Sequence, residues 1–273
     1  MSARYSHYLS RIRELAAQAA DRILDIYQRG FDVDTKCDGS PLTDADRAAH
    51  QVIVTGLAKL TPDIPTLSEE SDSRVLAMRQ DWEKFWLVDP LDGTREFVKR
   101  NDEFTVNIAL IDGHRPVLGV VHLPVSGVSY FACEGEGAFR CDPEGAERAI
   151  HARSYHGGAA TIVTSRSHPG KDLADYLARF EQCQGSFQAL AMGSSIKLCL
   201  VAEGRADVYP RLGPTSEWDT AAAQCVVEAA GGRVVDSKNS PLTYNKPSIL
   251  NPWFFAGGSG NHDWTAYLGE GNQ

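Results

Sequence analysis

The sequence predicts a layered fold of mixed helices and strands whose rhythm changes near residue 155. Two amphipathic helices come first, an antiparallel meander of strands follows, and strands then alternate with helices. The first arrangement is typical of α+β structure and the second of α/β layers. A chain of 273 residues can form one large domain or two packed ones. We expect an α+β half, 1–155, and an α/β half, 156–273, that share a cleft.

Apolar periodicity predicts two N-terminal helices. In residues 8–28 apolar side chains recur at spacings of three and four, which indicates a helix with one buried face, and Gly30 ends it. Residues 44–60 repeat this pattern, and Thr43 stands where an N-cap is needed.

The strands are predicted from short apolar runs bounded by Gly, Pro or Asp. Residues 85–88 indicate a buried strand that ends at Asp89. The meander comprises residues 104–111, 117–123 and 128–133. In the second half we expect strands at 161–164, 206–209 and 232–235 and helices at 172–180, 195–203 and 220–230.

Composition and charge narrow the function classes. With 42% hydrophobic and 23% charged residues the chain is typical of a folded globular protein. Its net charge of −9 argues against a nucleic-acid polymer or an anionic membrane as partner. No apolar run approaches a membrane span, and no secretory signal is visible. The six cysteines have no metal or disulfide spacing, which favours reduced, mostly buried thiols and a cytoplasmic location; peripheral attachment to the cytoplasmic face of the inner membrane stays open.

The segment Asp89-Pro90-Leu91-Asp92-Gly93-Thr94 carries the strongest chemical signal. A strand that ends in a proline-stiffened turn can aim two carboxylates at one point, and Gly93 removes bulk where a ligand approaches the backbone. Oxygen-binding divalent metals fit such a turn. Residues 94–99 begin a short helix whose positive end would face an anion. Taken alone, the segment could equally be an ordinary turn with an Asp cap.

Three further acidic segments stand at comparable places. Glu69 or Glu70 lies near the end of an extended segment, Asp219 lies at a helix start with small alanines behind it, and the segment 43–46 supplies Asp44 and Asp46 at the start of the second helix. Each by itself is more often a helix cap or a solvated acid than a ligand.

Together these segments resemble the inositol monophosphatase superfamily of lithium-sensitive, magnesium-dependent phosphatases. Its signature is an Asp near an N-terminal Thr, then Glu-Glu, then D-P-[LI]-D-[GS]-T, then W-D-x-A-A, and all four elements occur here in order. The resemblance implies a layered αβαβα sandwich of the sugar-phosphatase type.

The resemblance also implies the metal ligands. Glu69, Asp89 and the backbone carbonyl of Leu91 would hold one Mg²⁺, and Asp89, Asp92 and Asp219 a second, with a third, weaker ion near Glu69. Most of these ligands lie in the first half of the chain, and Asp219 lies in the second.

By the same resemblance three residues are catalytic. Asp46 and Thr94 would form a hydrogen-bonded pair that, with Glu69, orients and deprotonates the attacking water. The water would attack phosphorus in line with the leaving oxygen.

Residues that could select the substrate lie in the second half of the chain. Gly193-Ser194-Ser195 opens a helix and offers free backbone N–H groups, with Lys197 one turn inside and Arg211 after the next strand. A Ser cap with a surface Lys and Arg is the structural alternative. The motifs Gly-Ser-Ser-x-Lys and Tyr-Pro-Arg resemble the bisphosphate nucleotidase branch of the family. That resemblance implies that Lys197 and Arg211 bind the 5′-phosphate.

The substrate would also lie against residues near the metals and the motif at 165–168. The expected substrate-binding set is Glu69, Leu91, Asp92, Gly93, Thr94, Ser165, His168, Gly193, Ser194, Ser195, Lys197, Arg211 and Asp219.

The function that follows is magnesium-dependent hydrolysis of the 3′-phosphate of adenosine 3′,5′-bisphosphate (PAP) to AMP, extending to PAPS and serving sulfate assimilation. The alternative within the family is an inositol monophosphatase. An alternative of another class is a catalytically silent protein that binds metal or nucleotide. The expected partner is a small nucleotide bisphosphate, in a chain that is a monomer or a homodimer.

Overall fold

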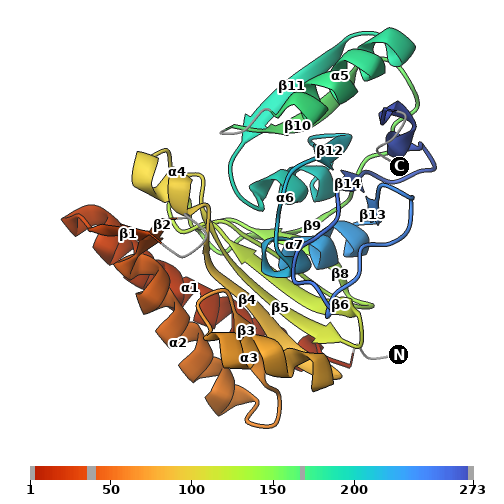
Figure 1. The fold of residues 1–273 in the computed structure, drawn as a ribbon. Helices are drawn as coiled ribbons and strands as arrows, with labels where there is room; N and C mark the ends of the chain where they lie inside the picture. Colours follow the sequence, from red (N-terminus) through yellow and green to blue (C-terminus); the bar gives the residue numbers. More distant parts are fainter. Residues whose placement is uncertain (1–3, 36–40, 167–169, 270–273) are drawn as a thin grey trace.

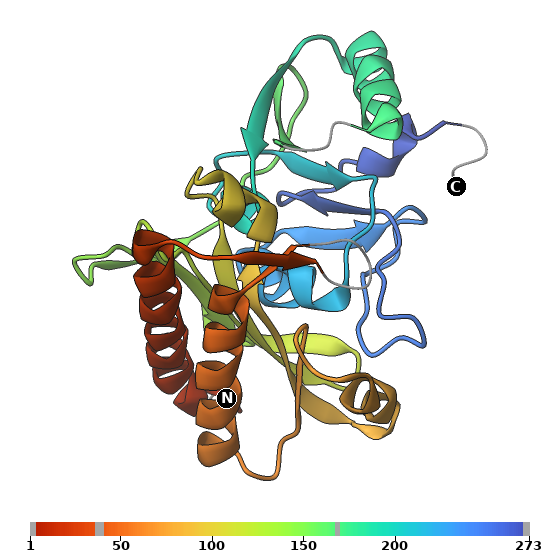
Figure 2. The ribbon, with the colours of Figure 1, turned by 60° about the vertical axis from the view of Figure 1, so that its left-hand side comes forward.

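Helical layers and sheets alternate through the protein in the order α, β, α, β, α (Figure 1). The computed structural model describes residues 4–35, 41–166 and 170–269. The first layer consists of α1 (Ser6–Arg29) and α2 (Asp44–Leu60), which lie side by side on one flank of the molecule (Figure 2). This is the layered sandwich that the family resemblance implies.

The larger sheet has seven strands within the described part of the chain, in sequence order from β3 to β9. Only β3 and β4 run parallel, and the other neighbouring pairs are antiparallel. The strands are β3 (Thr66–Ser68), β4 (Lys84–Asp92), β5 (Thr105–Asp112), β6 (Arg115–His122), β7 (Ser129–Cys133), β8 (Gly137–Cys141) and β9 (Glu147–Ile150). The predicted meander is therefore confirmed as β5, β6 and β7.

The smaller sheet has the order β11-β10-β12-β14-β13. The strands β10, β11 and β12 are parallel, whereas β14 runs antiparallel to β12 and β13. Their bounds are Ala160–Ser165 for β10, Phe187–Met192 for β11, Val208–Arg211 for β12, Arg233–Asp236 for β13 and Phe254–Gly257 for β14.

Two helical layers flank the smaller sheet. Between the sheets lie α6 (Ile196–Ala202) and α7 (Glu217–Ala229), and beyond the smaller sheet lie α5 (Lys171–Gln184) and the 3-10 helix η2 (Trp264–Tyr267). The remaining elements are the strand pair β1 (Val33–Thr35) and β2 (Pro41–Thr43), the helices α3 (Ser73–Met78) and α4 (Thr94–Lys99), and the 3-10 helix η1 (Arg79–Asp81).

Alternation along the central strands separates the apolar cores. In β4, Trp86 and Val88 pack toward α1 and α2, whereas Phe85 and Leu87 face the helices between the sheets. A strand buried on both faces reads as a continuous apolar run, as residues 85–88 do.

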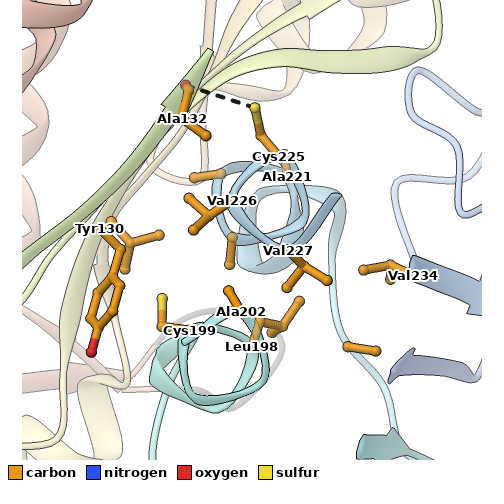
Figure 3. Packing of buried hydrophobic residues seen from close by; sticks show 14 of the residues in the cluster. Tyr130, Ala132, Leu198, Cys199, Ala202, Ala221, Cys225, Val226, Val227 and Val234 are labelled. Atoms are coloured by element: carbon orange, nitrogen blue, oxygen red, sulfur yellow. Dashed lines mark hydrogen bonds between the residues drawn. The ribbon is translucent and has the colours of Figure 1, made fainter. Parts of the chain in front are cut away.

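Helix α7 is buried between the two sheets. Figure 3 shows Val226 pointing toward Tyr130 of β7 and Val227 toward Val234 of β13. The Cys225 thiol donates to the carbonyl oxygen of Ala132 in β7 at 3.8 Å (Figure 3). Small side chains on both α7 and the sheet let them approach closely.

The short strands β8, β9, β11 and β14 do not follow from the apolar pattern. Strand β11 lies at the edge of its sheet with its side chains partly or fully exposed, so it shows no buried apolar run. Strand β14 is a fully buried run of four residues, and periodicity alone does not distinguish such a run from a buried helical segment.

Three of the described cysteines, Cys133, Cys199 and Cys225, are buried thiols, while Cys183 is exposed. Among the described residues, no helix combines the length and apolar character needed to cross a bilayer.

Gly119 in β6 marks the closest approach of sheet and helix. A Cβ atom there would lie 2.3 Å from the carbonyl oxygen of Ala222. We expect Gly119→Ala to destabilise the protein by about 1–3 kcal/mol, because α7 or β6 must shift. Urea unfolding would measure this. Gly170→Ala is the control, since a Cβ there meets no atom within 4 Å; equal midpoints for the two variants would contradict the predicted packing.

Candidate active site

A bulge at the end of β4 brings Asp89 and Asp92 to the same face of the sheet. Asp89 pairs with Asn107 of β5 and Asp92 with Thr105, so three steps along β4 match two along β5. The extra residue turns Leu91 into the core under α1 and α2. Without the bulge, residues three apart would point to opposite faces.

Asp219 reaches the same point from the first turn of α7. Its carboxylate accepts the N–H of Ser216 at 2.8 Å in a capping box, which orients the side chain. One oxygen from each of Asp89, Asp92 and Asp219 lies within 4.8 Å of the others. An all-oxygen donor set of this charge fits a hard divalent cation.

The carboxylates of this cluster are buried and repel one another when no cation is bound. Burial, followed by repulsion from Asp92 and Glu69, raises the pKa of Asp219 to about 8. Burial also raises the pKa of Asp92, against the attraction of Lys197. A bound cation would offset both the cost of burying the charged carboxylates and their mutual repulsion.

Asp46, Thr94 and Leu91 form a second cluster beside these carboxylates. The Thr94 hydroxyl lies 3.3 Å from Oδ1 of Asp46 and 3.3 Å from the Leu91 carbonyl oxygen. The other oxygen of Asp46 accepts the N–H and hydroxyl of Thr43 at 2.7 Å each, in the capping box that begins α2. The structure thus brings Asp46 and Thr94 together as the expected pair.

A cleft with a volume of about 590 Å³ opens over these groups. Glu69, placed just after β3, lines it together with Thr94, Asp92 and Asp219. Ser165, Gly93 and Arg211 line both this cleft and the adjoining pocket, which also holds Gly193, Ser194, Ser195 and Lys197. His168 lies outside the described residues.

Two expectations about the turn before α6 are wrong. The N–H groups of Gly193 and Ser195 are not free, because they donate to Glu103 at 2.8 Å and to Asp92 at 2.5 Å. Lys197 is the second residue of α6, not one turn inside it. These N–H groups were expected to be available to a phosphate, whereas the carboxylates of Glu103 and Asp92 already accept them.

Lys197 and Arg211 nevertheless form a cationic pair at the pocket. Burial lowers the pKa of Lys197 to about 8; the nearby Asp92 raises it and the Arg211 charge lowers it. The Lys197 ammonium donates to the carbonyl of Ser194 at 2.6 Å. The Nε of Arg211 is buried without a hydrogen-bond partner. An anion in this pocket would satisfy both cations.

Thr105 and Asn107 support the site and were missed by motif reasoning. Both side chains lie 3.4 Å from Oδ2 of Asp92, and both hydrogen-bond the Ser195 hydroxyl at 2.8 Å. The available signal was two polar residues at alternate positions in an otherwise apolar strand.

Glu217, which has no assigned role in the motifs, fastens a loop to the start of α7. Its fully buried carboxylate accepts the backbone N–H groups of Asn245 and Lys246 at 2.9 and 3.0 Å and the Lys246 ammonium at 2.6 Å. Asn251 in the same loop donates to the Ser216 carbonyl at 2.7 Å. The loop therefore holds the helix turn that carries Asp219.

Comparison with known proteins places this arrangement in a class. Residues 5–266 match the inositol monophosphatase family, and the chain belongs to that family. One relative is the 3′(2′),5′-bisphosphate nucleotidase CysQ of Escherichia coli strain K12, 49% identical over 249 residues, which cover 90% of this chain and 98% of the relative. CysQ of Haemophilus influenzae is 33% identical over 94% of this chain and 95% of its own length. The crystal structure of CysQ from Bacteroides thetaiotaomicron matches with a TM-score of 0.81 and 41% identity, covering 94% of this chain and 99% of that one.

We expect Glu217→Gln to lower the free energy of unfolding by about 2–4 kcal/mol, because it leaves the half-buried Lys246 ammonium without its counter-charge. Urea unfolding would measure the loss. The matched control is Glu134→Gln, which breaks the exposed pair with Arg115 at 3.7 Å and should cost less than about 1 kcal/mol. Equal losses of unfolding free energy in both variants would contradict a stabilising role for the buried Glu217–Lys246 pair.

Proposed function

We propose that the protein is a magnesium-dependent phosphoric monoester hydrolase, a 3′(2′),5′-bisphosphate nucleotidase. It removes the 3′-phosphate of adenosine 3′,5′-bisphosphate and releases AMP and phosphate. The same chemistry extends to the 3′-phosphate of PAPS. The substrate assignment draws on the relatives named 3′(2′),5′-bisphosphate nucleotidase CysQ.

One observation carries this proposal. Asp92 and Asp219 of the carboxylate cluster and the cationic pair Lys197 and Arg211 line adjoining parts of one cleft. A substrate with two phosphates matches both charges at once: one phosphate is held through cations at Asp89, Asp92 and Asp219, and the other by Lys197 and Arg211 directly. The orphaned Nε of Arg211 supports an anion there.

Two Mg²⁺ ions, with a third near Glu69, are part of the proposal. Asp89, Asp92, Asp219, Glu69 and the Leu91 carbonyl would hold them. When bound, the ions make a water nucleophilic near neutral pH and neutralise charge on the phosphoryl and leaving oxygens.

The chain's own groups orient the nucleophile. The Thr94 hydroxyl lies 3.3 Å from Oδ1 of Asp46, whose other oxygen is engaged by Thr43, and Thr94 lines the cleft. Thr94 and Glu69 accept hydrogen bonds from the attacking water. One proton of the water passes to the Thr94 oxygen as the Thr94 proton passes to Asp46, and the other proton stays on the oxygen that bonds to phosphorus while the bond to the leaving 3′-oxygen breaks. The buried Asp46 is 1% exposed, which keeps bulk water away from this relay.

Phosphate release should require a divalent ion and the Asp89 carboxylate. We expect chelation to abolish release and Asp89→Asn to lower kcat/KM by more than about 100-fold, because even residues outside the ligand shell contribute 10–100-fold. Phosphate release from adenosine 3′,5′-bisphosphate at fixed Mg²⁺ would measure both.

Asp25→Asn is the matched control, since Asp25 is exposed on α1 and makes a 3.8 Å contact with Arg22. Wild type and Asp89→Asn that are equally inactive on every phosphate ester would favour a silent binding protein. Turnover that survives exhaustive chelation would eliminate the metal mechanism.

The second phosphate should decide substrate preference. We expect kcat/KM for adenosine 3′,5′-bisphosphate to exceed that for inositol 1-phosphate by about 100-fold, since charged hydrogen bonds contribute roughly 1.5–3 kcal/mol each. Lys197→Met, which keeps the length of the buried side chain, should remove most of this preference. A panel that includes PAPS and fructose bisphosphate would measure it.

Turnover of inositol 1-phosphate equal to or better than that of the nucleotide would replace the proposal with an inositol monophosphatase. A preference unchanged in Lys197→Met would remove Lys197 from the substrate site.

A further inference from the structure

Glu103 lies where the two sheets meet and holds three donors. Its carboxylate accepts hydrogen bonds from Nε and a terminal nitrogen of Arg166 at 2.7 and 2.6 Å, and from the backbone N–H of Gly193 at 2.8 Å. The Glu103 side chain is 16% exposed and that of Arg166 is 46% exposed. The two-point Arg–carboxylate geometry fixes direction as well as distance.

These contacts tie three segments that are distant in the sequence. Glu103 stands two residues before β5, Arg166 directly follows β10, and Gly193 directly follows β11. Arg166 also donates to the Ala191 carbonyl at 3.0 Å, and its own N–H donates to the Met192 carbonyl at 3.4 Å. One carboxylate therefore couples the larger sheet to two neighbouring strand ends of the smaller sheet.

The turn that begins at Gly193 has little room to move. A Cβ at Gly193 would lie 2.7 Å from the Glu103 carbonyl oxygen, and Ser194 has a left-handed φ of 45°. At the far end of the turn, Ser195 donates its N–H to Asp92 at 2.5 Å. Two carboxylates, Glu103 and Asp92, thus hold the turn at its two ends.

The position of this turn sets the position of a cation. The Lys197 ammonium donates to the carbonyl of Ser194 at 2.6 Å, so a displaced Ser194 would displace the ammonium. Ser194, Ser195 and Lys197 line the inner pocket beside Arg211. The distance between the metal cluster and the cationic pair therefore depends on how Glu103 holds Gly193.

We propose that Glu103 and Arg166 are positioning residues that set the spacing between the site of the reacting phosphate and the site of the second phosphate. The inference rests on the proposed function, because it assumes a substrate with two phosphates. Glu103 acts through Gly193 and does not touch the substrate. Its loss loosens the turn at Gly193, while Ser195 keeps its contact with Asp92 at the other end of the turn, so the binding of bisphosphates weakens while the chemical step stays intact.

The test compares two substrates in the Glu103→Gln variant. Gln keeps the size of the side chain but removes the charge that holds Arg166. We expect KM for adenosine 3′,5′-bisphosphate to rise roughly 10-fold with kcat within about 2-fold of wild type. For p-nitrophenyl phosphate, which has no second phosphate, both KM and kcat should stay unchanged.

Three further variants separate positioning from general destabilisation. Arg166→Lys keeps the charge without the two-point geometry, so its KM should fall between those of wild type and Glu103→Gln. Arg166→Met should have a smaller effect than Glu103→Gln, because Gly193 keeps a charged acceptor in Arg166→Met, whereas in Glu103→Gln the acceptor is neutral and the amide NH₂ group opposes the Arg166 guanidinium. Glu147→Gln breaks the remote Arg13–Glu147 pair at 2.8 Å and should leave both substrates unaffected.

The outcomes are distinguishable. Equal changes for both substrates, or no change in KM for the bisphosphate, would overturn the positioning role while the proposed function stands. Wild-type protein that hydrolyses p-nitrophenyl phosphate but not the bisphosphate would overturn the proposed function, and the positioning role with it. A KM that rises in proportion to a fall in melting temperature across all variants would indicate general destabilisation, and it would also overturn the positioning role.

Discussion

Repulsion among buried carboxylates is the constraint on which the rest of this structure depends. Asp89, Asp92 and Asp219 place oxygens within 4.8 Å of one another, and Asp89 is 1% exposed. Like charges at this separation in a poorly solvated cleft are costly unless cations or protons offset them. Burial, followed by this repulsion, raises the pKa of Asp219. The fold must hold these groups against their mutual repulsion until positive charge arrives.

The layered architecture supplies the restraint. Strand β4 is buried on both faces, so the bulge that presents Asp89 and Asp92 together lies in a rigid part of the sheet. Helix α7 is packed between the sheets with Gly119 beneath it, and the buried Glu217 fastens its first turn. Asp219 cannot retreat from the other carboxylates without disturbing this packing. Binding geometry is thus prepared by the apolar core.

Charge in the cleft is arranged in two zones. The overall charge of −9 is unfavourable for an anionic substrate, and the acidic cluster intensifies this at the site. Next to Asp92, Lys197 and Arg211 make the local charge positive, although the two cations repel each other. A ligand with one phosphate can satisfy only one zone, whereas one with two phosphates can satisfy both. The turn held by Glu103 and Asp92 separates the two zones, so it bears directly on substrate choice.

The local chemistry of the site can be predicted from short stretches of the sequence. The strand that ends at Asp89, the short helix after Gly93, the cap at Thr43 and the acidic start of α7 are each specified by a few adjacent residues, because capping, turn formation and apolar periodicity act over one or two turns of chain. The αβαβα order was implied by the family resemblance that these segments carry together. Strand β11 was missed because exposure removes its apolar run, and β14 because a short buried run has no periodicity that identifies it as a strand.

Only the tertiary structure decided which groups meet. The bulge opposite Thr105 and Asn107, the Glu217 contact with Lys246, and the Glu103 contact with Gly193 join residues that lie 13 to 90 positions apart. Such contacts depend on strand register and layer packing, which no short stretch of sequence encodes. For the same reason the N–H groups of Gly193 and Ser195 looked available in sequence and are engaged in the fold. The sequence specified the chemical groups of this cleft, and the packing of two sheets around α7 decided their partners.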